Sequence, residues 1–241
     1  RVFKRDPDNP VDPDKVDLPP YYPDHPVSRR DWADYLETVQ ILDGKVGKVL
    51  DRLEQDGLAE DTIVFFFSDH GRPHVRAKQW LYDGGLRIPL IIRWPGKIKP
   101  GSIRTQLVSA IDFAPTALEF AGIKPPGHMQ GMSFADANGK KREYIAAARD
   151  RCDETYDRIR CIRTERFKYI RNFLPYLPYT QFNQYKERGY PMLPLLKVLY
   201  HKGELTAEQE NFMAPIKPEE ELYDLKNDPH EVHNLADDEK Y

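Results

Sequence analysis

The sequence predicts an α/β protein followed by a smaller α+β unit with an antiparallel sheet, and two observations carry this prediction. Short apolar runs at 63–67 and 88–94 alternate with helical patterns at 28–53 and 111–121, which is the element order of an α/β sheet. Beyond about residue 140, strand-like runs follow one another without helices long enough to cross between parallel strands. We therefore assign 1–140 to the α/β part and 141–241 to the antiparallel unit.

The first helix is expected from Ser28 onward. Ser28, with Asp31 three residues later, fits an N-cap, and Gly57 fits a stop. The segment before the helix is rich in Pro and Asp and starts without Met, so we expect a fragment of a longer protein. Apolar residues recur along the helix at three- and four-residue steps, which places them on one face: Trp32, Tyr35, Leu36, Val39, Leu42, Val46, Val49, Leu50 and Leu53.

Two strands and a second helix follow. The run 63–67 is apolar throughout without alternation, which is typical of a strand buried on both faces of a parallel sheet. The run 88–94 predicts a second buried strand, closed by Pro95 and Gly96. The pattern at 111–121 predicts a helix that ends at Gly122.

The second unit is expected to contain three short strands, at 143–148, 158–163 and 167–173. The stretch 173–200 is crowded with Pro and Tyr and has no clean period. Thr206 and Gln209 fit the cap of a short helix ahead of an acidic tail. This unit is therefore read as antiparallel sheet with little helix.

Composition excludes several classes of function. The chain has 241 residues, with 36 Lys+Arg against 39 Asp+Glu, so no broad basic face for nucleic acid is expected. An aromatic content of 12% argues against disorder. The longest apolar runs are about five residues, whereas a membrane span needs roughly 20. Cys152 and Cys161 cannot build a disulfide framework or a CxxC metal site; we read them as core cysteines, with one hairpin disulfide as the alternative.

Polar residues follow directly after the first apolar strand, where ligands bind in an open sheet. Asp69 and His70 can both face a divalent cation while Gly71 lets the backbone turn away, although such residues also serve as plain turn formers. Lys78 in the next loop would suit a sulfate or phosphate oxygen. The alternative is a set of solvated loop cations, whose members are Arg72, His74, Arg76, Lys78 and Arg87.

These residues and their surroundings resemble the C-terminal half of the type I sulfatases. The resemblance rests on Ser-Asp-His-Gly at 68–71, on the loop from Lys78 to Gly-Gly at 84–85, and on Arg-Ile-Pro at 87–89. Further markers follow in the order of that family, at 43–47, 90–96, 112–116, 131–133, 162–164, 168–170, 221–225, 228–229 and 234–236.

The resemblance implies an alkaline-phosphatase-like fold, a mixed or parallel sheet flanked by helices, with 1–140 as the C-terminal half of its core. It implies one calcium ion with Asp69 and His70 as metal ligands, and Lys78 as the catalytic, sulfate-binding lysine. His74 and Arg72 have no firm counterpart and are weaker candidates for substrate contacts. These five residues are the predicted site.

The sequence also departs from the family. Its nucleophile is a formylglycine made from Cys or Ser in a C/S-x-P-S-R signature, and no such run occurs here, nor does the Asp-Asp pair that supplies further calcium ligands. We expect both in a missing N-terminal half of the same protein, and we expect this fragment alone to be inactive. Family membership implies a periplasmic, secreted or lysosomal location.

Within the family, the run 16–24 and Arg-Arg-Asp at 29–31 look most like the N-sulfoglucosamine sulfohydrolase (heparan N-sulfatase) branch. The implied function is hydrolysis of a sulfated carbohydrate, N-sulfoglucosamine of a heparan-type glycosaminoglycan. The alternatives are a phosphonate or phosphodiester hydrolase of the same superfamily, and a non-catalytic fragment that binds sulfated glycan. Four residues either line a sugar subsite or pack the second unit onto the core: Tyr176, Tyr179, Tyr185 and Arg188.

Overall fold

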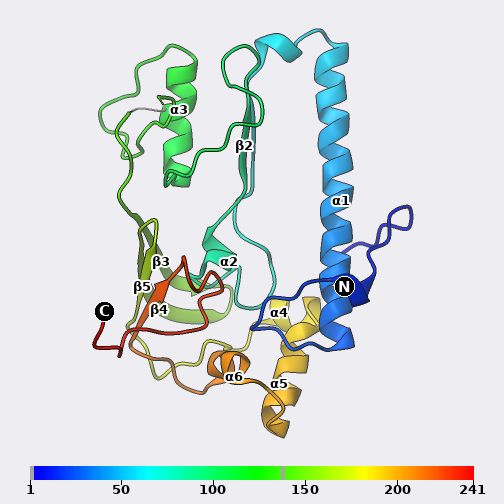
Figure 1. Cartoon of the computed structure of the whole chain (residues 1–241), viewed down its shortest axis with the longest axis vertical. Coiled ribbons are helices and arrows are strands. Elements are labelled where there is room, and N and C mark those ends of the chain that lie inside the picture. The colour runs from blue at the N-terminus through cyan, green and yellow to red at the C-terminus, as the bar shows by residue number, and fades with distance from the viewer. Residues whose placement is uncertain (1–2, 137–138) are drawn as a thin grey trace.

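The long helix α1 (Pro26–Gln55) and the strands β1 (Val64–Phe67) and β2 (Leu90–Arg93) extend away from a packed base (Figure 1). The structure is a computed structural model that describes residues 3–136 and 139–241. Helix α3 (Phe113–Phe120) lies on the far side of β2 from α1 (Figure 1). Short elements connect these parts: η1 (Pro13–Lys15), η2 (Ala59–Asp61), α2 (Asp83–Leu86) and η3 (Ala110–Asp112).

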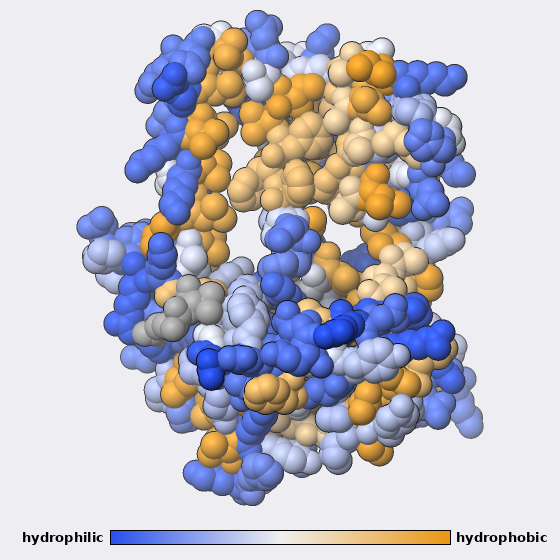
Figure 2. All heavy atoms as spheres, turned by 180° about the vertical axis from the view of Figure 1, so that it is seen from behind, coloured by the Kyte–Doolittle hydropathy of each residue, from blue (hydrophilic) through white to orange (hydrophobic). Residues whose placement is uncertain are grey.

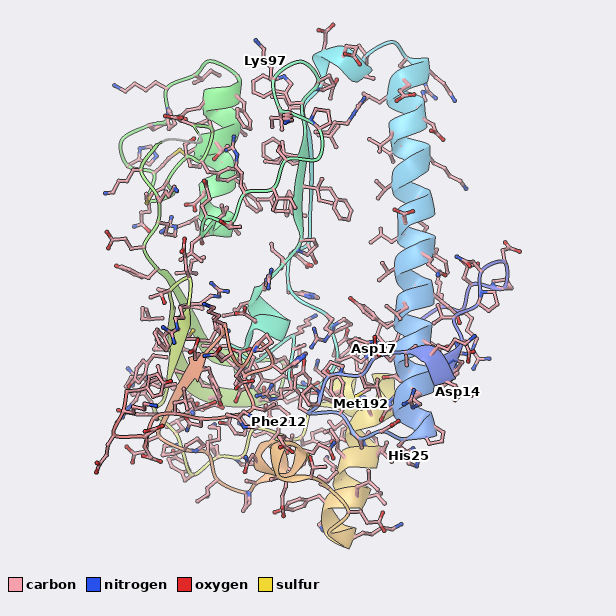
Figure 3. All side chains as sticks on the ribbon, in the orientation of Figure 1. Asp14, Asp17, His25, Lys97, Met192 and Phe212 are labelled. Atoms are coloured by element: carbon pink, nitrogen blue, oxygen red, sulfur yellow. The ribbon has the colours of Figure 1, made fainter. Side chains whose placement is uncertain are left out.

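Helix α1 begins two residues earlier than predicted. His25, at the foot of the helix (Figure 3), is the N-cap, because its Nδ1 accepts the N–H of Val27 at 3.1 Å. The predicted cap at Ser28 is therefore wrong, and Ser28 lies buried in the first turn. The predicted stop is confirmed, since α1 ends at Gln55 and Gly57 follows with a φ of 69°.

The buried face of α1 is polar, which the apolar pattern did not predict. Glu37 is 1% exposed, and its carboxylate accepts the backbone N–H groups of Asp6 at 2.7 Å and Val11 at 3.1 Å. The N-terminal segment is thereby folded against the helix. Apolar residues in the later turns are exposed instead, with Val49 at 68%. Figure 2 shows apolar side chains gathered on the upper part of the molecule.

Strands β1 and β2 lie where the apolar runs predicted them, but they pair antiparallel, with Val64 opposite Arg93 and Phe67 opposite Leu90. The parallel sheet that the apolar runs suggested is not formed between these two strands, because the connection at 68–89 contains only the four-residue α2 and no crossover helix that would return the chain parallel to β1. Phe67 is 49% exposed, so among the described residues this strand is not covered on both faces.

The antiparallel sheet predicted for the second unit is confirmed. Its order is β3-β4-β5-β6, and every neighbouring pair is antiparallel. The strands are β3 (Ile145–Cys152), β4 (Thr155–Arg163), β5 (Phe167–Asn172) and β6 (Glu220–Asp224). The prediction missed β6 because Glu221, one of its inward positions, carries a charge; the carboxylate is 1% exposed and accepts hydrogen bonds from Tyr82, Asn172, Tyr179 and Tyr223.

Helices complete the base. The aperiodic stretch 173–200 contains α4 (Gln184–Gly189) and most of α5 (Met192–Lys202), neither of which was predicted. The short helix α6 (Ala207–Met213) has the predicted capping box of Thr206 and Gln209. Met192 and Phe212 point into the base from α5 and α6 (Figure 3), and both are buried.

The main core draws on both sides of the boundary predicted at residue 140. Val75, Trp80 and Tyr82 pack in one cluster with Ile159 and Ile170 of the sheet. The division into 1–140 and 141–241 stays a prediction. Cys161 belongs to this core and Cys152 is half-buried; both are free, so the hairpin disulfide is not formed. Within the described parts of the chain, no helix has the length and apolar character that a membrane crossing requires.

Candidate active site

The first part of the site is the turn that follows β1. The Asp69 side chain is 86% exposed, and its Oδ1 lies 3.7 Å from Nε2 of His70. The other ring nitrogen of His70, Nδ1, lies 2.6 Å from the carbonyl oxygen of Gly71. With Nδ1 donating to this carbonyl, Nε2 keeps its lone pair on the side of Asp69, which is the state that binds a metal. Ser68 Oγ donates to the His70 carbonyl at 2.7 Å and tightens the turn.

Asp69 and His70 fit part of a calcium shell. Calcium takes six to eight ligands, mostly oxygens, so two side chains leave most of the shell to other groups. The described residues contain no cluster of three or more His, Cys, Asp or Glu that could hold a metal ion. The role of Asp69 and His70 as metal ligands stays a prediction, and further ligands would have to come from other groups.

Three glycines bring this turn against the next loop. The Gly71 N–H donates to the Gly85 carbonyl at 2.9 Å. A Cβ added at Gly71 would overlap the carbonyl oxygen of Gly84, and one added at Gly85 would overlap the carbonyl oxygens of Ala77 and Trp80. Backbone atoms therefore pack directly on backbone atoms here. This packing explains the Gly-Gly pair and holds the Asp69–His70 turn close to residues 77–80.

Lys78 lies in the loop that this packing fixes. Its N–H donates to the Arg72 carbonyl at 2.9 Å and closes residues 72–78 into a compact turn. Its Nζ lies 5.2 Å from the centre of the Tyr185 ring. No ion pair of Lys78 with a carboxylate occurs among the described residues, and the side chain is half-buried. Its ammonium is therefore available to an anionic ligand.

Arg76 anchors the same loop to the C-terminal segment. Its guanidinium donates to the carbonyls of His230, at 2.8 Å, and Glu231, and it packs on the rings of Tyr82 at 4.0 Å and Tyr21 at 4.6 Å. The residue is 6% exposed. Its donors are thus used on the backbone and not presented to a ligand.

His74 is buried completely. Its ring lies among Phe3, Trp32 and Tyr35, and its Nε2 is 3.5 Å from Oδ2 of Asp31. Burial lowers the pKa of His74, an effect that Asp31 opposes. These contacts are structural, and a ring without solvent exposure touches no ligand in this conformation. A role of His74 as a substrate contact remains a prediction.

Arg72 contacts aromatic residues other than the Tyr185 ring that lies near Lys78. It donates to the hydroxyl of Tyr21 and packs 5.4 Å from the Trp32 ring. It lines a cavity of about 440 Å³ together with Arg87 and His230. Of the five cations that the sequence grouped, Arg72, Arg76 and Arg87 line this cavity, whereas His74 is buried and Lys78 contacts Tyr185. A substrate contact by Arg72 remains a prediction.

Sequence reasoning missed the charged network that supports the Gly-Gly pair. Lys168 Nζ lies 2.6 Å from Oδ1 of Asp83 and 2.6 Å from Oε1 of Glu231. Arg163 pairs with Asp83 at 3.1 Å, and the Asp83 N–H donates to Glu231 at 2.7 Å. Burial opposes ionisation of Asp83, but Arg163 and Lys168 together hold its pKa below the usual value. Arg163 and Lys168 appeared in the sequence as family markers without a physical role.

The tyrosines that the sequence offered as candidate sugar contacts differ in burial and in the residues that they contact. Tyr179 is buried, stacks on Phe212 at 5.2 Å and donates to Glu221 at 2.7 Å, so it packs the base. Tyr176 is 67% exposed. Tyr185, beside Lys78, is 37% exposed. Packing therefore accounts for Tyr179, while Tyr185 lies at the site.

Comparison with known proteins decides the family. Residues 6–123 match the model of the sulfatase family, and residues 71–191 match the model described as N-sulphoglucosamine sulphohydrolase, C-terminal. The chain belongs to the sulfatase family. The predicted family and its C-terminal position are both confirmed.

Individual relatives agree with this assignment. The sulfatase chain is 45% identical over 228 residues to an ulvan-active sulfatase of Formosa agariphila, covering 94% of this chain and 38% of the relative. It is 35% identical over 150 residues to an N-acetylglucosamine-6-O-sulfatase of Bacteroides thetaiotaomicron, covering 57% of this chain and 27% of the relative. The chain thus spans less than half the length of these curated relatives.

Solved structures confirm the predicted fold class. A structure solved in complex with its substrate, D-glucosamine-2-N,6-O-disulfate, is 28% identical, with a TM-score of 0.57, covering 87% of this sulfatase chain and 37% of that chain. A structure described as a putative sulfatase from Bacteroides thetaiotaomicron has a TM-score of 0.64 at 23% identity, covering 99% of this chain and 48% of that one.

Proposed function

We propose that the complete protein is a sulfatase, a hydrolase that releases sulfate from a sulfated carbohydrate. The observation that supports this is the juxtaposition of the Asp69–His70 turn with the Lys78 loop, held by the Gly71–Gly85 hydrogen bond, in a chain of the sulfatase family. A turn that offers metal ligands beside an unpaired ammonium suits a bound oxyanion.

Each residue of the site takes a separate role in this proposal. Asp69 and His70 contribute two ligands to a calcium ion, which when bound supplies positive charge to the sulfate oxygens. Lys78 pairs with a sulfate oxygen and offsets the charge that develops as the ester bond breaks.

Neither cysteine suits the role of nucleophile. Burial raises the pKa of the Cys161 thiol to about 12, and that side chain lies in the core. Cys152 is half-buried at the end of β3, and its Sγ donates to the Asp153 carboxylate at 4.0 Å. We propose that the nucleophile, a formylglycine by family resemblance, and the remaining calcium ligands come from a part of the protein outside this chain.

The relatives suggest two classes of substrate. The ulvan-active relative covers 94% of this chain, which favours the sulfate ester of a polysaccharide. The match to the N-sulphoglucosamine sulphohydrolase model favours N-sulfoglucosamine of the heparan type. Because such polysaccharides are extracellular, we place the protein in the periplasm or outside the cell.

The test is sulfate release by the purified complete protein. Ulvan oligosaccharides, N-sulfoglucosamine and a phosphonate monoester are compared at equal concentration, with and without a calcium chelator. Release of sulfate that the chelator abolishes supports the proposal, and the faster sulfated substrate identifies the class. Faster cleavage of the phosphonate favours the phosphonate hydrolase alternative, and glycan binding without turnover favours the non-catalytic one.

A further inference from the structure

Lys186 of α4 places a buried ammonium against the loop that carries Lys78. The residue is 1% exposed, and its Nζ donates to the carbonyls of Pro73 and, at 3.0 Å, His74. The same nitrogen lies 5.3 Å from the centres of the Trp80 and Tyr190 rings. Two carbonyls and an aromatic wall thus replace the water that normally surrounds a lysine.

No carboxylate pairs with Lys186 among the described residues. Burial, together with the nearby charge of Lys78, lowers the pKa of Lys186 to about 7. The other buried lysines of the base differ, since Lys168 and Lys217 each contact a carboxylate. Burying a lysine in an apolar site without a counter-ion lowers the stability of the folded state. This cost indicates that the contacts of Lys186 with the loop have a role of their own.

The loop at 72–79 has an unfavourable backbone conformation that surrounding contacts must stabilise. Arg76 and Gln79, on either side of Lys78, have φ angles of 61° and 92°. Such backbone conformations are unfavourable for residues other than glycine and persist only where surrounding contacts fix them. Arg76 fixes the loop to the C-terminal segment, and Lys186 fixes its first half to α4.

The Tyr185 ring connects the two lysines. Its centre lies 5.2 Å from Nζ of Lys78 and 5.8 Å from Nζ of Lys186. Helix α4 is in turn fixed by Asn183, which accepts the Lys186 N–H at 2.9 Å and donates to Asp153 and Glu154 at 3.1 Å. The position of Lys78 therefore depends on α4 through both the backbone and the ring.

We propose that Lys186 is a positioning residue, which holds the 72–79 loop and the Tyr185 ring and thereby fixes where the Lys78 ammonium is presented to a bound sulfate. This inference rests on the proposed function. Lys186 itself does not touch substrate, because its side chain is buried and both of its carbonyl partners belong to the loop.

The test is a double-mutant cycle in the complete protein with Lys186→Met and Lys78→Ala. Lys186→Met is expected to lower kcat for sulfate release about tenfold to a hundredfold, the cost of misplacing a catalytic group by about 1 Å. In the Lys78→Ala background the same change is expected to have no further effect, because Lys186 acts through Lys78. Equal, multiplicative losses in both backgrounds would overturn the proposal.

Lys217→Met is the matched control. Lys217 is a lysine of the same base, 3% exposed, that contacts Asp157 and not the loop. Its loss is expected to lower stability and to leave kcat of the folded protein unchanged. If it lowers kcat as much as Lys186→Met does, the effect belongs to general destabilisation and the proposal fails.

Amide hydrogen exchange tests the inference without activity. Residues 72–79 are expected to exchange at least tenfold faster in Lys186→Met than in the wild type, and at the wild-type rate in Lys217→Met. Unchanged exchange in Lys186→Met overturns the positioning role even if the protein is an active sulfatase. Conversely, a wild type that releases no sulfate overturns the proposed function, and the exchange result alone then decides whether Lys186 positions the loop.

Discussion

Replacing Lys168 by Met removes the cation that lies between two buried carboxylates. Lys168 is 0% exposed, and its Nζ is 2.6 Å from both Asp83 Oδ1 and Glu231 Oε1. After the change, Asp83 still pairs with Arg163 at 3.1 Å, whereas Glu231 keeps the Asp83 N–H at 2.7 Å. Because Met is similar in length and volume to Lys, the perturbation is one of charge and not of packing.

The expected cost is about 3–5 kcal/mol of unfolding free energy, the range for breaking a buried ion pair by removing one partner. We expect the lower end, because Arg163 still neutralises Asp83. Burial raises the pKa of Glu231 above the ordinary 4.5, an effect that Lys168 opposes. Without Lys168 that pKa rises further.

The sign of the pH dependence follows. The pKa of the Glu231 carboxyl is higher in the folded state than in the unfolded state. Between pH 4.5 and the raised pKa, the folded state therefore binds more protons than the unfolded state, and the free energy of unfolding falls as the pH rises. The unfolding free energy lost in Lys168→Met is therefore expected to be largest at pH 7 and above, and to become smaller as the pH approaches 4.5.

Urea unfolding of the complete protein at pH 7 and pH 5 measures this loss. The control is Arg171→Met, which removes a pair with the exposed carboxylates of Glu219 and Glu220 and should therefore lower the unfolding free energy far less than Lys168→Met does. A Lys168→Met cost below about 1 kcal/mol at pH 7 would refute the reasoning, as would a cost that is the same at both pH values.

Three further predictions concern the site. Lys78→Ala is expected to lower kcat/KM for sulfate release at least tenfold, about 1.4 kcal/mol of barrier, and a smaller loss in steady-state kinetics would remove the assigned role. Asp69→Ala is expected to abolish tight calcium binding in titration calorimetry, whereas Asp61→Ala in η2 is expected to leave it intact. Gly85→Ala is expected to lower the thermal midpoint by several degrees, because its Cβ would overlap two carbonyls, while Gly44→Ala in α1, with open space around it, should not lower it.

Local sequence patterns were sufficient to predict those elements that are determined by residues close together in the sequence. The apolar runs located β1 and β2, and the polar residues after β1 located the turn of Asp69 and His70. Gly57 and Gly122 marked helix ends because both adopt a positive φ, at 69° and 73°. Each of these signals depends on the chemistry of one residue or one short run.

Elements with a charged inward position could not be predicted in this way. Strand β6 carries Glu221 on its buried face, and its burial is possible only because Tyr82, 139 positions away, and Asn172, 49 positions away, donate to the carboxylate. The polar face of α1 has the same cause, since Glu37 is satisfied by backbone N–H groups of the N-terminal segment. A sequence pattern that treats charge as exposure assigns such residues to the surface.

The sequence was likewise insufficient to predict which side chains of the candidate site are available to a ligand. The sequence places several cations in one loop, and their order does not reveal which one is left for a ligand. Arg76 uses its donors on two carbonyls of the C-terminal segment, and His74 is buried against Asp31. Lys186, from a distant helix, supplies the loop with a second buried cation. Because Arg76 uses its donors on backbone carbonyls and His74 is buried, we expect Lys78, whose side chain has no ion pair with a carboxylate among the described residues, to be the cation of this loop that meets a bound sulfate.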